Sequence, residues 1–305
     1  MRQQYIDILK GFTIIWVLWM HMDMPELINP AVQMPIFFFI SGAFYKAKDT
    51  AFSSQLKKDS FKLLLPALCF TLLSYVIIGA KNGFSWNVFH DLNNAVIASI
   101  VWFLFALFIF RTIAYPLAKA HKSVYILLIA SAIYIPGFYL YSKELYWIIP
   151  CIPIAHAGCF MLYFAIGLLW GGRILSCMDK LNVREVVKMA LMVGYILLVH
   201  ALDWKYSYLR YIPYCIYGLP YTLCVIYLMS KFAFFSQRFE KSTKPLVYIG
   251  QNSIVFYLTH WPLWMHVFKP LGWNHYLCFV IIVMLEFPLI YIFNNYIPWM
   301  IGKKK

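Results

Sequence analysis

Asp7, Lys10 and His21 are ionisable residues on the first apolar stretch of the chain. On a helix, the side chains of Lys10 and His21 would point in directions about 20° apart around the axis, so they share a face. They would lie roughly 16 Å apart along the axis. Asp7 would lie one turn before Lys10, where its carboxylate can pair with the ammonium and lower the cost of burying both. Ionisable groups in a membrane helix usually face a cavity or pathway, and a neutral imidazole there can act as a general base. The three residues therefore predict a reactive face on the first helix.

A simpler interpretation of the same residues stays open at this point. Lys10 can extend its ammonium to the inner lipid headgroups, Asp7 can lie at the interface, and His21 can end the helix at the outer rim. This interpretation involves no chemistry.

Other polar residues also interrupt apolar stretches: Ser41, His156, His200, His260 and Glu286. If a straight helix begins near Leu246, His260 lies about 20 Å from the cytoplasmic side, and His21 lies at about 24 Å on its own helix. The two imidazoles are thus predicted at similar depth, which does not establish contact. A carboxylate in the middle of a span, as for Glu286, must be paired, protonated or in contact with water. We interpret His156 and His200 as hydrogen-bonded between helices.

The composition identifies the elements that must position these residues. Of 305 residues, 63% are hydrophobic and only 12% are charged, about half the charged share of a soluble domain. Ten apolar stretches, each near the length of a membrane-spanning helix, lie near residues 6–23, 29–46, 62–80, 94–111, 123–141, 149–171, 188–202, 208–230, 247–268 and 276–300. We predict an all-α, polytopic integral membrane protein with about ten transmembrane helices.

The positions of the basic residues predict the orientation. With the N-terminus inside, about 20 of the 26 Lys and Arg fall in cytoplasmic segments, as expected from the enrichment of basic residues on that side. Both termini are therefore predicted in the cytoplasm. The chain shows no repeat or linker, so we expect one transmembrane domain over residues 1–305, without an additional soluble domain. In a membrane chain the net charge of +14 does not predict a nucleic-acid partner; membrane lipids are the expected surroundings.

The remaining candidate sites are excluded on spacing. The seven cysteines are scattered singly, and we interpret them as small buried hydrophobic residues. The histidines show no HxxH or HExxH spacing, so no metal site is predicted. The first apolar stretch contains Asp7 and has no cleavage pattern, so we expect it to be a retained helix.

Several blocks of the sequence resemble the acyltransferase family 3 membrane proteins. The first is YIDILKGF with Lys10, ten residues and then His21, which is similar to the family's basic residue, ten residues and histidine. The others follow in family order: MPIFFFISGAFYK at 34–46 with Ser41-Gly42, KLLLP at 62–66, WFLFAL at 102–107, FAIGL at 164–168 and IGQNSIVFYLTH at 249–260.

The chain departs from the family pattern at two positions. Lysine stands at position 10 where arginine is usual, and lysine cannot make the same bidentate contact with phosphate. Met34-Pro35 replaces the acid that often precedes the aromatic run. This second departure resembles the branch that contains sugar O-acetylases such as fucose 4-O-acetylase.

The resemblance implies a membrane O-acetyltransferase. Such an enzyme moves an acetyl or other acyl group from cytoplasmic acyl-CoA to a hydroxyl of a cell-envelope glycan or its lipid-linked precursor, in the bacterial cytoplasmic membrane. Acyl-CoA is then a co-substrate, and no metal is implied. His21 would deprotonate the acceptor hydroxyl or carry the acyl group itself, and Asp7 would hold Lys10. The resemblance further implies binding roles for Lys10, Ser41, Lys62, Trp102, Asn252 and His260. Glu286 is a further candidate binding residue because its carboxylate lies in the middle of a span.

A second function class stays open. A transporter or flippase could move a glycan or its lipid-linked precursor without acyl transfer. Polar groups spread along the whole path across the membrane would favour transport. A histidine and a basic residue separated by a distance that matches the two ends of an acyl-CoA donor favour catalysis. A purely structural subunit would leave the cost of inserting Lys10, His21 and Glu286 without explanation.

Overall fold

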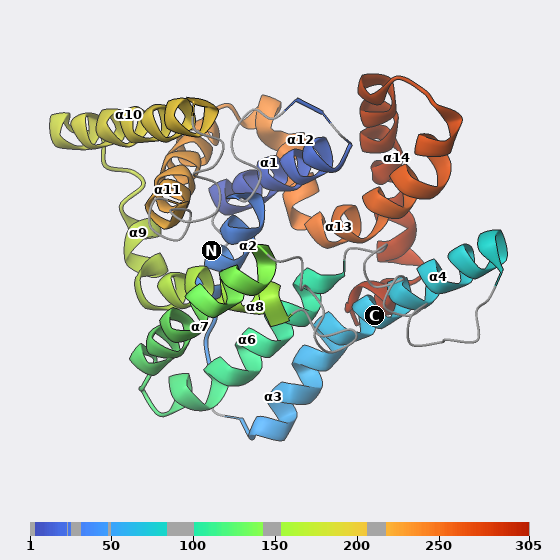
Figure 1. Ribbon diagram of the computed structural model, residues 1–305, viewed down its shortest axis with the longest axis horizontal. Helices are drawn as coiled ribbons and strands as arrows, with labels where there is room; N and C mark the ends of the chain where they lie inside the picture. The colour runs from blue at the N-terminus through green and yellow to red at the C-terminus, as the bar shows by residue number, and fades with distance from the viewer. Residues whose placement is uncertain are drawn as a thin grey trace. The chain divides into compact units, whose positions relative to one another are not determined.

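The computed structural model describes residues 4–22, 24–25, 32–47, 50–83, 101–142, 154–205 and 218–304. Within these ranges every regular element is a helix and none is a β-strand (Figure 1). The predicted all-α class is therefore confirmed. A helix suits a membrane because it satisfies its backbone hydrogen bonds within one segment.

The α-helices of the described ranges are, in chain order, α1 Gln4–His21, α2 Gln33–Ala43, α3 Phe52–Asp59, α4 Leu65–Asn82, α6 Trp102–Lys119, α7 Val124–Ser142, α8 Ile154–Ile166, α9 Gly172–Ser176, α10 Val183–Lys205, α11 Leu219–Ser236, α12 Glu240–Gln251, α13 Ser253–Pro262 and α14 His275–Asn295. Segments of π-helix continue three of them, at Ser60–Leu64, Gly167–Gly171 and Leu263–Phe268. Short 3-10 helices follow at Lys269–Leu271 and Pro298–Ile301.

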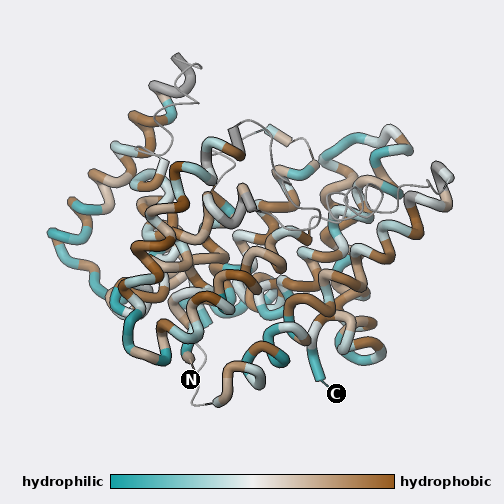
Figure 2. The backbone as a smooth tube through the Cα atoms, turned by 60° about the horizontal axis from the view of Figure 1, so that its bottom comes forward, coloured by the Kyte–Doolittle hydropathy of each residue, from teal (hydrophilic) through white to brown (hydrophobic). Residues whose placement is uncertain are grey.

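Long apolar helices make the chain a polytopic membrane protein. In the described ranges, five stretches have the length and hydropathy of a membrane span: Phe52–Ile77, Trp102–Lys119, Gly158–Ser176, Leu219–Ser236 and His275–Asn295. Figure 2 shows hydrophobic residues along much of the helical backbone. The count of ten spans stays a prediction, and the stretches near 29–46, 94–111, 149–171 and 208–230 extend outside the described residues.

The predicted stretch at 247–268 is not one straight helix. It is divided at Asn252, whose φ of −114° and ψ of 20° are not helical, so α12 ends and α13 begins there. Asparagine side chains compete for local hydrogen bonds and favour such breaks, and Asn252 accepts a hydrogen bond from Asn294 Nδ2 at 2.9 Å. The depth of about 20 Å expected for His260 assumed a straight helix, an assumption that this break does not meet, and the depth itself stays a prediction.

Contacts group the described chain into two compact units. Unit 1 comprises Met1–Val17, Pro25–Phe44 and Leu162–Gln251, and unit 2 comprises Leu18–Met24, Tyr45–Met161 and Asn252–Lys305. The helix α1 contributes to both, because its last turn from Leu18 belongs to unit 2.

In unit 1, helix α2 packs closely against the helix that contains the π-segment Gly167–Gly171. A Cβ at Gly42 would lie 2.1 Å from the carbonyl oxygen of Phe164, so only glycine permits this approach. The neighbouring Ser41 is half-buried on the same helix. In the Ser41-Gly42 pair of the second sequence block, glycine is therefore required at position 42 by the packing of the two helices.

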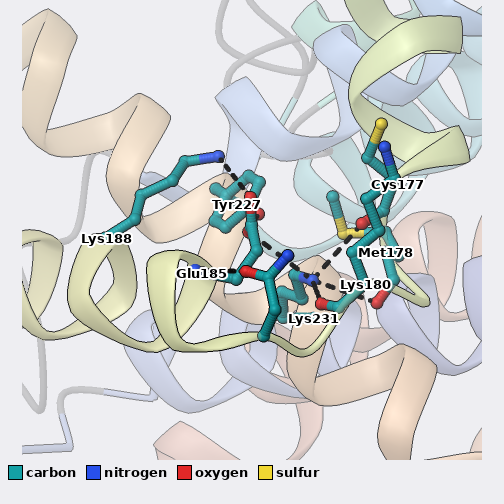
Figure 3. Close-up of polar contacts among 8 residues, drawn as sticks. Cys177, Met178, Lys180, Glu185, Lys188, Tyr227 and Lys231 are labelled. Atoms are coloured by element: carbon teal, nitrogen blue, oxygen red, sulfur yellow. Dashed lines mark hydrogen bonds and ion pairs between the residues drawn. The ribbon is translucent and has the colours of Figure 1, made fainter.

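Unit 1 also contains a buried lysine whose charge is fully surrounded by acceptors (Figure 3). Lys231 on α11 is 2% exposed. Its ammonium donates to the carbonyl oxygens of Cys177 at 3.3 Å, Met178 at 3.2 Å and Lys180. These carbonyls lie in the turn after α9. Lysine has three hydrogens to donate, so all of them are used to hold this turn against α11.

A carboxylate completes the surroundings of Lys231. Glu185 Oε2 lies 3.7 Å from the ammonium and accepts a hydrogen bond from the Tyr227 hydroxyl, while Lys188 lies 4.1 Å from the centre of the Tyr227 ring. The hydrogen bond from Tyr227, together with Lys188 and Lys231, lowers the pKa of Glu185 below its ordinary 4.5. Because this pKa is lowered on folding, Glu185 stabilises the fold above pH 4.5 and loses that contribution as the pH falls.

In unit 2, a hydrophobic cluster holds the end of α1. Its members are fully or almost fully buried and come from the end of α1, from the π-segment after α13 and from α14: Leu18, Met22, Met24, Trp264, Phe268, Cys278 and Ile282. The cluster anchors the turn of α1 that bears His21.

Candidate active site

The described structure brings two of the predicted residues into direct contact. His21, in the last turn of α1, and His260, on α13, are 239 positions apart in sequence. His21 Nδ1 lies 2.9 Å from His260 Nε2, and the two rings are parallel to within 2°. His260 is 1% exposed, whereas His21 is half-buried. Two imidazoles that the sequence could place only at similar depth therefore form one hydrogen-bonded pair.

The hydrogen-bond partners determine which nitrogen of each ring carries hydrogen. His260 Nδ1 lies 2.6 Å from the carbonyl oxygen of Phe256, which can only accept, so Nδ1 is the donor. In a neutral His260 the other nitrogen, Nε2, is then an acceptor. His21 must therefore donate from Nδ1, and its own Nε2 carries a lone pair. Within the described residues no group bonds that Nε2.

This arrangement suits a general base. A proton that reaches His21 Nε2 creates an imidazolium whose Nδ1 hydrogen already points at an acceptor. His260 thus holds the tautomer of His21 and can stabilise its charged form, as the orienting partner does in a hydrolase triad.

Aromatic rings surround the pair. The ring of Trp261 packs edge-on against His21, with centroids 5.1 Å apart and planes at 66°. Tyr257 lies on the same helix as His260, and its hydroxyl accepts the backbone N–H of Phe103 at 3.3 Å. The neighbouring Trp102, predicted to line the cavity, is half-buried and stacks on Phe160 at 5.5 Å. Trp102 is thus linked to the histidine pair through Phe103 and Tyr257.

A third histidine, His275, holds the end of the helix that bears His21. His275 Nδ1 donates to the carbonyl oxygen of Met22 at 2.9 Å. Carbonyls at a helix end have no partner within the helix, so this bond satisfies one of them. His275 could not be predicted from the sequence, because a lone histidine at a helix start gives no pattern that reveals a partner 253 residues away.

Glu286 on α14 is buried and is hydrogen-bonded to Thr259, the residue before His260. It is 0% exposed, and both carboxylate oxygens lie 2.7 Å from Thr259 Oγ1. Thr259 Oγ1 also lies 2.7 Å from the carbonyl oxygen of Val255. Threonine has one hydroxyl hydrogen, so Thr259 donates either to a Glu286 oxygen or to the Val255 carbonyl; in the second case a protonated Glu286 donates to Thr259. No cation pairs with Glu286 in the described part of the chain.

Asn252, another predicted binding residue, lies in a separate polar cluster of unit 2. It is 7% exposed. Its Oδ1 accepts from Asn294 at 2.9 Å and from Lys303 at 3.3 Å, and Lys303 also donates to Asn294 at 2.5 Å. The geometry therefore gives Asn252 a role at the break between α12 and α13.

Lys62 lies in the π-segment Ser60–Leu64, and its side chain is exposed. Its backbone carbonyl faces Gly302, where an added Cβ would lie 2.7 Å away. An exposed ammonium is accessible to an anionic ligand.

Asp7, Lys10 and Ser41 all belong to unit 1. Asp7 is 2% exposed and accepts a hydrogen bond from Gln251 at 3.3 Å. Gly250, next to Gln251, has no room for a Cβ, which would lie 1.8 Å from the Asp7 carbonyl oxygen. Lys10 is half-buried on α1. Its predicted pairing with Asp7 stays a prediction.

His156 and His200, interpreted above as hydrogen-bonded between helices, differ in what the structure describes of them. His200 is exposed on α10, and the side chain of His156 lies outside the described residues. Within the described ranges, no group of three His, Cys, Asp or Glu side chains is placed to hold a metal ion.

The comparison with protein families identifies the chain. A family model described as an acyltransferase domain matches residues 3–302, nearly the whole chain. The chain belongs to acyltransferase family 3. No curated protein and no solved structure matches it. This acyltransferase family 3 protein is therefore a membrane acyltransferase, and its assignment to the branch of sugar O-acetylases stays a prediction.

Proposed function

We propose that this acyltransferase moves an acetyl group from cytoplasmic acyl-CoA to a hydroxyl of a cell-envelope glycan, or of its lipid-linked precursor, in the bacterial cytoplasmic membrane. The observation that carries the proposal is the hydrogen bond between His21 and His260. It leaves a lone pair on His21 Nε2 in a chain that belongs to an acyltransferase family. The Met34-Pro35 block supports a sugar as the acceptor.

The proposed reaction uses that lone pair. His21 Nε2 takes the proton of the acceptor hydroxyl as its oxygen attacks the thioester carbonyl carbon, and a tetrahedral intermediate forms. The carbon–sulfur bond then breaks, and the departing thiolate takes the proton back from His21. The products are the ester and free CoA. General-base catalysis of this kind contributes about 10²–10⁴-fold.

The basic residues are proposed to bind the donor. Lys10 and the exposed Lys62 would contact the phosphates or the pantetheine arm, and Asp7 would hold Lys10. Lys10 and His21 lie on one continuous helix, so a long donor could meet a cation and the base at opposite ends. Ser41 and Trp102 would contribute to the walls of the substrate cavity.

The direct test follows radiolabelled acetyl-CoA with purified protein in nanodiscs. We compare wild type, His21→Ala and the matched control His200→Ala, in which an exposed histidine is removed. Wild type and His200→Ala should consume acetyl-CoA. His21→Ala should bind CoA and unfold at the same temperature as wild type, but lose at least about 10²-fold in kcat.

Other outcomes decide between the alternatives. Label retained on the wild-type protein would indicate an acyl-histidine relay instead of direct transfer. If wild type neither binds nor consumes acetyl-CoA, the donor assignment fails and transport of a glycan or lipid-linked precursor becomes the better explanation.

A further inference from the structure

The residue after His260 presents an unused hydrogen-bond donor beside the proposed base. Trp261 is near the end of α13, and its ring centroid lies 5.1 Å from that of His21. Its Nε1 is buried and has no hydrogen-bond partner in the described structure. A buried N–H without an acceptor destabilises the folded chain, because it has given up its bonds to water.

The surroundings of Trp261 differ from those of comparable tryptophans. In the described residues, Trp16 and Trp264 also have buried indole nitrogens without partners. The ring of Trp264 packs against His275 at 5.2 Å and lies within the hydrophobic cluster. The ring of Trp261 also packs against this cluster, but it contacts His21, the imidazole that is hydrogen-bonded to His260. An unsatisfied donor at this position points to an acceptor that the substrate supplies.

We propose that the indole N–H of Trp261 donates a hydrogen bond to the carbonyl oxygen of the bound acyl thioester. This inference rests on the proposed function. As the acceptor oxygen bonds to the carbonyl carbon, the carbonyl electron pair moves onto the oxygen, and the N–H of Trp261 stabilises the negative charge. When the carbon–sulfur bond breaks, the pair returns to form the ester carbonyl. His21 moves the proton, and Trp261 binds the oxyanion.

The test removes the N–H and keeps the ring. Trp261→Phe and a variant with benzothienylalanine at position 261, in which sulfur replaces N–H, are compared with wild type and with Trp264→Phe. Loss of one oxyanion donor typically lowers kcat by about 10²-fold. Both substitutions at position 261 should show this loss with little change in the KM for acetyl-CoA, while Trp264→Phe should keep kcat near wild type.

The outcomes separate this inference from the function on which it rests. If His21→Ala is inactive but both variants at position 261 keep the wild-type kcat, the role of Trp261 is refuted and the general base stands. If benzothienylalanine restores the activity that Trp261→Phe loses, ring shape and not the N–H is responsible, which also refutes it. If wild type does not consume acetyl-CoA, both proposals fail.

Discussion

Lys231 in unit 1 and His21 in unit 2 are both held by specific polar partners, but they differ in what those partners leave unused. The ammonium of Lys231 donates to three carbonyl groups and lies near Glu185 (Figure 3). Among the described residues, the imidazole of His21 is bonded at Nδ1 only. A charged group whose hydrogen bonds are all made stabilises the fold. An imidazole with one nitrogen held by a hydrogen bond and a lone pair on the other nitrogen can act as a base. Under the proposed function, His21 is therefore the reacting group, and the Lys231 cluster is structural.

The largest effect on activity should follow the loss of the partner of His21. His260→Ala removes the acceptor that holds the Nδ1 hydrogen, so His21 can adopt the other tautomer and present a hydrogen instead of a lone pair. We expect kcat to fall on the order of 10²–10³-fold with the KM for acetyl-CoA little changed, measured in the radiolabel assay.

The conservative variant His260→Gln tests whether His260 acts by accepting the Nδ1 hydrogen of His21. In His260→Gln the amide oxygen can accept the same hydrogen, so part of the lost kcat should return. Wild-type turnover in His260→Ala would show that His260 does not prepare His21 for catalysis. The contrast between His21 and the Lys231 cluster would then be refuted.

The largest effect on stability should come from the other region. Lys231→Met leaves three carbonyls and Glu185 without their buried cation, which costs about 3 kcal/mol. The midpoint of thermal unfolding should fall by several degrees, while kcat per folded molecule stays near wild type. The matched control Lys188→Met removes a more exposed ammonium, whose side chain is 44% exposed, and should cost less than about 1 kcal/mol. If Lys231→Met abolishes turnover without lowering stability, the Lys231 cluster is not purely structural.

The smallest effect should come from Glu286. Its hydrogen-bond set is complete with a neutral acid, and Glu286→Gln keeps a neutral donor to Thr259. We expect turnover within about twofold of wild type and a change in the free energy of unfolding below about 1.5 kcal/mol, measured by the same assay and by thermal unfolding. An inactive, well-folded Glu286→Gln would show that the carboxylate must ionise.

The sequence predicted the helical class and placed Asp7, Lys10 and His21 on one helix, because apolar length and helical spacing are local properties. The contact of His21 with His260 could not be derived from the residues, since it joins positions 239 apart and depends on tertiary packing. The depth predicted for His260 assumed a straight helix, and the break at a single asparagine, Asn252, could not be read from the apolar pattern. Trp261 gave no signal, because it does not stand out in a chain that is 20% aromatic, and His275 is one of eight histidines.

The state of His21 itself tests the central claim most directly. Nitrogen NMR of histidine-labelled protein in nanodiscs, with the His21 signals assigned by their loss in His21→Ala, reports which ring nitrogen carries hydrogen. We predict hydrogen on Nδ1 and a bare Nε2 in wild type, with a shift toward hydrogen on Nε2 in His260→Ala. Hydrogen on Nε2 of wild-type His21 at neutral pH would contradict the proposal that this residue is the base.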